Sequence, residues 1–344
     1  MFVIRPVKKS DLKDLVKLAK GAGAGLTTLP ADEKLLAARI EISINSFANE
    51  GGDEPRYFFV AEDVKKKKII GTSAILANVG KVLPFYNYKL LKLMQVTKEP
   101  YIKVETQVLS LSNDYTGACE LATLYLDPEY RSAGVGKVLS KCRYLFMAAY
   151  PQHFNSIIMA EIRGWVDDDG ESPFWNAVGR HFFNMDFDEA DRINGLGNNQ
   201  FIGDLMPKYP IYTNLLPEGA RAVIGKPHVK SAAALKLLEQ EGFKYRGAVD
   251  IFDAGPIVEA HIDHIKSVRD ATQAMVHISK DEIVGGACLV ANPSPTEFAV
   301  INAPVEFHDG KKNKIIISQD SAEALNVVAG MEVIYLPPEH MHNG

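Results

Sequence analysis

The chain has 344 residues, a formal net charge of −5 at pH 7 and a sequence pI of about 6.0. Apolar residues make up 47% and charged residues 24%, which are ordinary values for a globular protein and exclude a disordered chain. The acidic balance favours neither a nucleic-acid backbone nor an anionic membrane surface as a partner.

The cysteines Cys119, Cys142 and Cys288 are far apart, and no two of them have the spacing of a metal or redox site. This usage indicates a reducing compartment. No apolar run approaches the roughly 18 residues that a membrane-spanning helix needs, and no secretory segment follows the start. We therefore expect a cytoplasmic protein.

The N-terminal part alternates strand and helix signals. Residues 2–7 have the pattern of a strand, and Ser10 caps a helix that runs to about residue 20. The segment 21–30 is too glycine-rich to be helical and is either a mobile loop near the chemistry or a plain connector. An amphipathic helix is predicted over about 31–47.

Strand signals dominate the next part of the chain. Residues 57–62 and 69–77 predict a hairpin, and residues 104–111 predict a further strand. The stretch 84–99 is aromatic and basic, without a clear period. A central strand over 121–126 ends at Asp127-Pro128, because proline cannot continue the pairing.

A glycine-containing loop joins this strand to the next helix. Gly134 and Gly136 lie where we expect the backbone to turn tightly, and apolar residues from Val135 to Ala149 repeat at helical spacing. The first amides of a helix have no internal partner and lie at the positive end of the helix dipole, so such an entry can bind phosphate. The loop lacks the Gly-Lys-Ser/Thr of a nucleoside triphosphate site and the third glycine of a dinucleotide site.

These residues resemble a known motif. The pattern Arg-x-x-Gly-x-Gly after a Leu-x-Leu strand is similar to the acetyl-coenzyme A binding motif of the GNAT acyltransferase superfamily. The resemblance implies that the loop amides hold the pyrophosphate of coenzyme A, and that the strand lies beside the pantetheine arm and the thioester. It also implies an α/β (α+β) fold with a mixed central sheet flanked by helices. The implied cofactor-binding residues are Leu124, Leu126, Arg131, Gly134, Val135 and Gly136.

A second motif follows later in the chain. Residues 228–241 predict an amphipathic helix that is closed by Gly242 and followed by a strand over about 244–253. The helix resembles the second GNAT motif, Asn-x-x-Ala-x-x-Leu-Tyr-x-x-x-Gly-Phe, with Ser231 in place of the asparagine. The chain departs from this motif at Leu238, where many relatives have a tyrosine that protonates the departing thiolate. Another residue must then supply the proton.

The segment between the two motifs contains charged residues within an apolar run. Residues 156–164 predict a strand in which Glu161 and Arg163 interrupt an apolar run, and such charges need partners or a ligand. An ion pair between them or across strands is the alternative to a ligand. Residues 172–226, with a helix over 174–183, have the character of an insertion specific to the family.

After residue 271 the composition shifts to short strand-like runs separated by Pro, Gly and Asp/Asn turns. We expect a GNAT-like domain over 1–270 and a small β-rich appendage or barrel over 271–344, and we expect the chain before about Ser279 to fold without the appendage. No metal site is predicted, because no carboxylate or cysteine accompanies the histidine pairs at a suitable spacing. These pairs are His261 with His264, and His340 with His342.

Several stretches together resemble the arginine N-succinyltransferase family over about residues 1–265. They include Leu-Ser-Asn-Asp-Tyr-Thr-Gly at 111–117, Glu-Leu-Ala-Thr-Leu-Tyr-Leu-Asp-Pro at 120–128, Ala-Glu-Ile-Arg-Gly at 160–164 and Ile-Phe-Asp-Ala-Gly-Pro at 251–256. The resemblance implies transfer of succinyl from succinyl-CoA, a co-substrate rather than a bound cofactor, to the α-amine of L-arginine in arginine catabolism. Some relatives also accept ornithine and act as one of two paired subunits.

The resemblance also assigns site residues. Leu124 falls on the family's succinyl-CoA contact, and His228 falls on its proton donor. Free imidazole, with a pKa of about 6.5, suits protonation of a thiolate near neutral pH. A helix cap or a surface position is the alternative role for His228. For the substrate, a guanidinium requires carboxylates and the succinyl carboxylate requires a cation. The predicted groups are Glu120, Glu161, Asp114 and Asp186 for the guanidinium, and Arg163 for the succinyl group.

Two other functions stay open on the sequence. One is a GNAT enzyme that acts on a different amine, and the other is a non-catalytic subunit that binds acyl-CoA. The sequence also leaves open whether the chain forms a homo-oligomer or pairs with a related subunit.

Overall fold

The computed structural model describes residues 1–22, 26–167, 169–195 and 200–338. The strands are β1 (Phe2–Pro6), β2 (Arg56–Asp63), β3 (Lys68–Leu76), β4 (Asn87–Lys98), β5 (Tyr101–Ser112), β6 (Cys119–Leu126), β7 (Ile157–Glu161), β8 (Ile211–Tyr212), β9 (Lys244–Val249), β10 (Pro256–His261), β11 (Thr272–Ser279), β12 (Gly286–Asn292), β13 (Ala299–Phe307), β14 (Lys314–Ser318) and β15 (Glu332–Leu336). The α-helices are α1 (Leu12–Ala22), α2 (Glu33–Phe47), α3 (Val135–Ala149), α4 (Pro173–Ala177), α5 (Gly179–Phe183), α6 (Phe187–Gly195), α7 (Gln200–Leu205), α8 (Glu218–Val223), α9 (Ala232–Glu241), α10 (Lys266–Asp270) and α11 (Gln319–Leu325).

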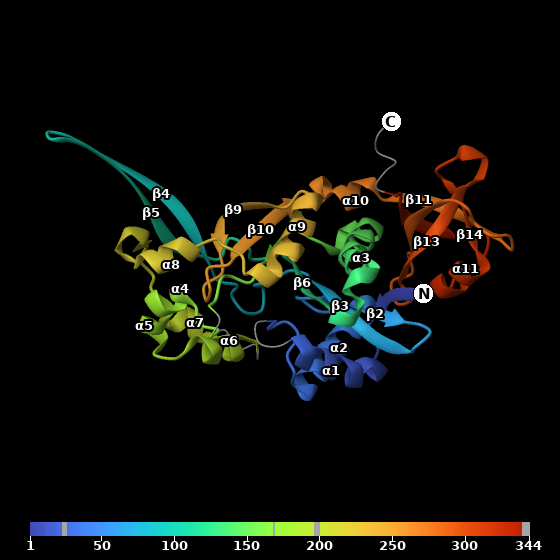
Figure 1. The fold of residues 1–344 in the computed structure, drawn as a ribbon, viewed down its shortest axis with the longest axis horizontal. Helices are drawn as coiled ribbons and strands as arrows, with labels where there is room; N and C mark the ends of the chain where they lie inside the picture. The colour runs from blue at the N-terminus through green and yellow to red at the C-terminus, as the bar shows by residue number, and fades with distance from the viewer. Residues whose placement is uncertain (23–25, 168, 196–199, 339–344) are drawn as a thin grey trace.

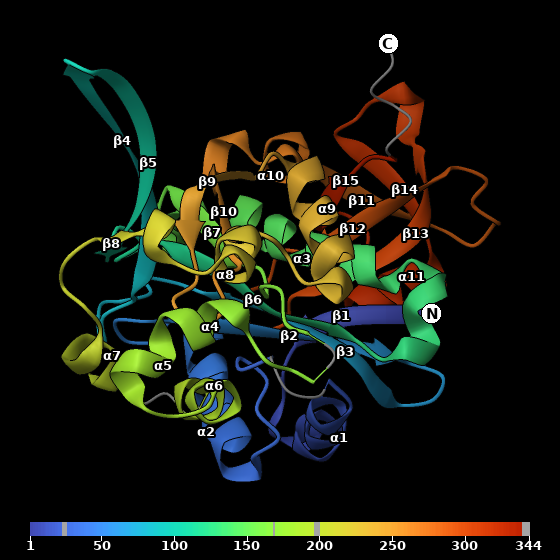
Figure 2. The ribbon, with the colours of Figure 1, turned by 60° about the vertical axis from the view of Figure 1, so that its left-hand side comes forward.

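A mixed central sheet flanked by helices forms the body of the molecule (Figures 1 and 2). Its strands follow the order β1-β2-β3-β6-β7-β10-β9-β4, and β6 and β7 are parallel. Alternate residues of β2 face opposite sides. Phe58 packs in the cluster that contains residues of α1 and α2, whereas Phe59 packs in the cluster that contains α3. The predicted α/β fold is confirmed.

The aromatic and basic stretch over 84–99 contains the whole of β4, which is one strand of a long hairpin. Strand β4 pairs with β5 along its whole length, from Asn87 opposite Ser112 to Lys98 opposite Tyr101. The hairpin extends beyond the body as an arm (Figure 1). The outer half of β4 is mostly exposed, so burial does not impose there the apolar alternation that marks a half-buried strand.

Two other predicted boundaries differ from the structure. The glycine-rich segment after residue 20 begins in helix, since α1 continues to Ala22, and its residues 23–25 lie outside the described part. The single helix predicted over 174–183 is two short helices, α4 and α5, which meet at Val178. Trp175 of α4 is fully buried and stacks on Phe183 of α5 and on Phe252.

The C-terminal strands close on themselves. They follow the order β12-β15-β11-β14-β13, and β12 also pairs with β13, so that the five strands make a small barrel. The barrel is joined to the central sheet by β13, which pairs with β1. Phe298, just before β13, is fully buried with its ring 5.8 Å from that of Phe59 and 5.0 Å from that of Phe146. The domain boundary at 270/271 stays a prediction, but the barrel and the sheet share one apolar core.

Two further observations concern cysteines and helices. Cys119, Cys142 and Cys288 are all buried free thiols. In the described part of the chain, no helix has the length and apolar character needed to cross a membrane.

Candidate active site

The site is organised by the point where β6 and β7 part. The two strands pair only through Cys119 with Ile158 and Glu120 with Met159, although β6 continues to Leu126. Beyond Glu120, β6 pairs with β3 on its other side. The last residues of β6 therefore have a free edge toward β7, as the resemblance to GNAT enzymes implies for the strand beside the thioester.

A bulge interrupts β6 in this free portion. Thr72 pairs with Tyr125 and Ala74 pairs with Ala122, so Thr123 and Leu124 together lie opposite Ser73. Thr123 has a φ of 58°, a left-handed conformation that is an outlier for a β-branched residue. Such strain persists only where the surroundings impose it, and it is concentrated at functional sites. The bulge lies at Leu124, the predicted succinyl-CoA contact.

The predicted phosphate loop is a short turn followed by α3. A 3-10 turn over Pro128–Ala133 ends at Gly134, whose φ of 72° favours glycine, and α3 begins at Val135. Gly136 lies within the first turn of α3 rather than at a tight bend. Its lack of a side chain therefore matters only because it leaves the helix amides open to a phosphate. Val135 is buried in the core. Arg131 donates from Nε to the Leu126 carbonyl at 3.4 Å.

Replacing Gly136 by valine is expected to weaken succinyl-CoA binding at least about tenfold, the cost of one charge-assisted hydrogen bond, because the side chain would stand between phosphate and amides. Gly136→Ala is the matched control, since a Cβ here would lie 3.5 Å from Leu126, an ordinary contact. Calorimetric titration of both variants measures the effect. Unchanged affinity in folded Gly136→Val would remove this loop from coenzyme binding.

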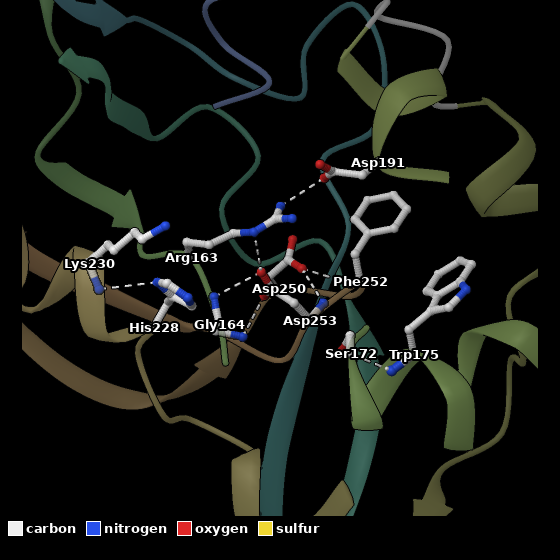
Figure 3. A network of polar contacts seen from close by, with 11 residues as sticks. Arg163, Gly164, Ser172, Trp175, Asp191, His228, Lys230, Asp250, Phe252 and Asp253 are labelled. Carbon is white, nitrogen blue, oxygen red and sulfur yellow. Dashed lines mark hydrogen bonds and ion pairs between the residues drawn. The ribbon is translucent and has the colours of Figure 1, made fainter. Parts of the chain in front are cut away.

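His228 is held at the start of the second-motif helix. Its backbone amide donates to the Arg163 carbonyl at 2.7 Å, and its Nδ1 accepts the amide of Lys230 at 3.1 Å (Figure 3). It is thus the N-cap of a 3-10 turn over Val229–Ser231 that leads into α9. Because Nδ1 accepts, the neutral ring carries its proton on Nε2, which is then a donor. Leu238, in the position of the usual tyrosine, is buried.

Arg163 is held by two carboxylates. Its guanidinium lies 2.9 Å from Asp191 and 3.3 Å from Asp253 (Figure 3). The same group lies over the ring of Phe187, 4.9 Å from its centroid. Asp253 also accepts the amide of Gly164 at 2.8 Å, an approach that a Cβ on Gly164 would block. Of the two roles considered for this charged residue, an ion pair or contact with a ligand, the ion pair describes Arg163. Its geometry favours fixing the end of β7, and with it the backbone of His228, over binding the succinyl carboxylate.

Glu120 and Glu161 are close neighbours at the parting of the strands. Burial raises the pKa of Glu120 to about 7, although the Arg56 and Arg39 guanidinium groups oppose the rise. Burial, followed by the carboxylates of Asp250 and Glu120, raises the pKa of Glu161 well above its ordinary value. Within the described residues, neither side chain forms a hydrogen bond or a close ion pair. A cationic ligand would relieve this repulsion.

The two other predicted acidic residues lie elsewhere. Asp114 is exposed in the turn between β5 and β6, and Asp186 is exposed and paired with Arg180. The structure thus brings together Glu120, Glu161 and Arg163, with His228 beside Arg163, but leaves Asp114 and Asp186 at the surface. Among the described residues, no three His, Cys, Asp or Glu side chains are grouped as a metal site requires, and His340 and His342 lie outside these residues.

Comparisons with known proteins identify the family. A family model described as "Arginine N-succinyltransferase beta subunit" matches residues 2–267. The chain belongs to the arginine N-succinyltransferase family. A protein named arginine N-succinyltransferase from Yersinia enterocolitica is 45% identical over 333 residues, covering 96% of each chain.

Two further members of the arginine N-succinyltransferase family match over nearly the whole chain. An Escherichia coli protein of that name is 43% identical over 337 residues, covering 97% of this chain and 96% of its own. The solved structure of arginine/ornithine succinyltransferase subunit AI from Pseudomonas aeruginosa is 34% identical, with a TM-score of 0.89 and coverage of 98% of both chains. The similarity therefore includes the C-terminal barrel.

In this member of the arginine N-succinyltransferase family, four charged residues at the site were not predicted from the sequence. Asp191 and Asp253 were not assigned as partners of Arg163, although Asp253 lies in one of the stretches that carry the family resemblance. Arg39 and Arg56 lie near Glu120, and no motif marks them. Their proximity arises only when α2 and β2 pack together.

Proposed function

We propose that this chain transfers the succinyl group of succinyl-CoA to the α-amino group of L-arginine and releases CoA and N2-succinylarginine. The observation that carries the proposal is the full-length similarity to proteins named for this reaction. Ornithine is a second acceptor to consider, because the Pseudomonas aeruginosa relative is named an arginine/ornithine succinyltransferase. The cytoplasmic location inferred from composition belongs to the same proposal.

The donor binds along β6 and α3 in this proposal. The amides at the start of α3 hold the pyrophosphate, and the thioester lies beside the bulge at Thr123 and Leu124. A bulge takes a residue out of the regular ladder, which lets a backbone amide donate to the oxyanion that forms on the thioester carbonyl. Because this role belongs to a backbone amide, it does not depend on which side chain stands at position 124.

Acceptor binding depends on charge. Glu161 and Glu120 offer carboxylates to the guanidinium of arginine, which suits planar, bidentate pairing. Binding of this cation would lower the pKa of both groups, because an opposite charge favours the ionised form. Arg163 then acts by fixing the end of β7, where Glu161 ends the strand, rather than by touching the succinyl group.

The chemistry requires two proton movements. The α-amine must lose a proton before it attacks the thioester carbonyl, and the CoA thiolate must gain one as it departs. His228 supplies the second proton from Nε2 in its imidazolium form, in which Nδ1 is also protonated and no longer accepts the amide of Lys230. The capping bond to Nδ1 therefore belongs to the neutral ring that remains after the proton has been transferred. The backbone contact of His228 with Arg163 couples the position of this acid to the end of β7.

Thiol release by the purified chain tests the proposal. Succinyl-CoA and acetyl-CoA are each offered with arginine, ornithine and lysine, and we expect succinyl-CoA with arginine to give the highest kcat/KM. A higher kcat/KM for another amine would assign a different GNAT reaction. No thiol release by the chain alone, with tight acyl-CoA binding by calorimetry, would identify a non-catalytic subunit, and adding a related subunit would then be the next measurement.

A further inference from the structure

A small pocket lies on the face of the sheet covered by α2. Its volume is about 50 Å³, and it is lined by Thr28, Arg39, Arg56, Phe58, Ala74, Leu76 and Thr123. Since a water molecule needs about 10–15 Å³, the pocket has room for a small polar group. Phe58, Ala74 and Leu76 supply apolar surface, and the two arginines and two threonines supply polar groups.

Arg39 is a largely buried cation whose hydrogen bonds all go to neutral groups. Its guanidinium donates to the carbonyls of Thr27 at 3.2 Å, Thr28 at 2.7 Å and Gly195 at 3.0 Å. Burial, followed by the charge of Arg56, lowers the pKa of Arg39 to about 10, although Glu120 opposes the shift. In the described part of the chain, no carboxylate forms an ion pair with Arg39. A buried charge of this kind is stabilised by an anionic ligand.

Arg56 adds a second cation at the same place. It begins β2, opposite Leu76 of β3, and its guanidinium is 3.9 Å from the Glu54 carboxylate, at the limit of an ion pair. Arg56 is 34% exposed, so its donors are accessible to a ligand. Two guanidinium groups beside the apolar side chains of the pocket can bind a short aliphatic chain that ends in a carboxylate.

We propose that this pocket binds the distal carboxylate of the succinyl group, with Arg56 and Arg39 as the residues that select succinyl-CoA over neutral acyl donors. The inference rests on the proposed function. Its position supports it, because Thr123 forms both the bulge of β6 beside the proposed thioester site and part of the pocket wall. A carboxymethyl group is small enough for a pocket of this volume. Arg163, the cation that the sequence suggested, is already paired with Asp191 and Asp253.

The same chemistry could come from the α-carboxylate of arginine, and the donor series separates the two sources. Butyryl-CoA is the probe, because its acyl chain has the length of the succinyl stem but no carboxylate. For Arg56→Met, we expect kcat/KM with succinyl-CoA to fall about 10- to 100-fold, as for loss of a charge-assisted hydrogen bond. We expect the ratio of kcat/KM for succinyl-CoA over butyryl-CoA to fall by about the same factor, because the loss of the Arg56 charge beside Glu120 affects the acceptor equally with both donors. Arg56→Lys keeps the charge and should retain most of the preference for succinyl-CoA.

Calorimetry with the two acyl-CoA donors gives a readout that does not depend on turnover. If Arg56→Met binds succinyl-CoA more weakly than the unsubstituted chain but binds butyryl-CoA equally well, the result would support the pocket even in a chain that fails to acylate arginine. Equal losses with both donors, relieved when L-argininamide replaces arginine, would assign the pocket to the α-carboxylate and overturn the succinyl assignment. An unchanged donor preference in folded Arg56→Met would overturn the site itself. Arg39 is the less suitable first target, because it also holds three backbone carbonyls.

Discussion

Replacing His228 by glutamine is expected to lower kcat about 10²- to 10⁴-fold, the usual cost of removing a general acid. The affinity for succinyl-CoA should change little, because the proposed role is proton transfer to the thiolate. Steady-state kinetics with arginine and calorimetric titration with succinyl-CoA measure the two effects separately.

The capping bond of His228 requires a matched control. Since Nδ1 accepts the Lys230 amide, loss of the ring also removes a cap that is worth about 1 kcal/mol. Asparagine is a good N-cap but no general acid. His228→Asn should therefore keep the stability of the unsubstituted chain and show the same decrease in kcat as His228→Gln. Retention of more than about a third of wild-type kcat in folded His228→Gln would contradict the acid assignment, since it lies far outside the general-acid range. Tyr125 or Tyr245 would then be the next acid to test.

The second large effect concerns the shared core. Phe298→Ala is expected to lower the free energy of unfolding by about 3–5 kcal/mol, the cost of deleting a buried phenylalanine ring. The ring is fully buried between Phe59 and Phe146, which belong to the central sheet and α3. Urea unfolding measures the change. Phe182→Ala is the matched control, because that ring is 42% exposed and its loss should cost under about 1 kcal/mol.

This packing also changes the expected outcome of truncation. The sequence suggested that the chain before about Ser279 folds alone, but removal of β12–β15 and Phe298 would expose apolar surface of the main core. We now expect the truncated chain to be insoluble or to unfold at a lower temperature than the intact protein. A soluble fragment with an unchanged melting temperature, or a Phe298→Ala variant as stable as Phe182→Ala, would show that the barrel is independent.

The sequence correctly predicted the helices and strands whose structure depends mainly on local sequence rather than on packing against distant residues. The amphipathic helix predicted over about 31–47 and the strand predicted over 57–62 appear as α2 and β2, because capping and apolar periodicity are local. Strand β4 was missed, since its pairing with β5 is the dominant interaction along the exposed arm. The break between α4 and α5 was also missed, because it depends on packing around Trp175.

The site divides in the same way. The phosphate loop and His228 belong to motifs that are contiguous in sequence, so the sequence could locate them. The two carboxylates of Arg163 come from α6 and from the turn after β9, and only the fold brings them together. The same holds for Arg39 and Arg56, which come from α2 and β2 and share a pocket only after the sheet is covered.

The contact between β1 and β13 has a consequence for synthesis on the ribosome. Ile4 is made long before its partner Val300. Until then, β1 presents an unpaired strand edge and the space that Phe298 fills stays open to solvent. Unpaired edges and exposed apolar surface promote association of nascent chains. We therefore expect the nascent chain to need chaperone protection until β13 has been made and has paired with β1.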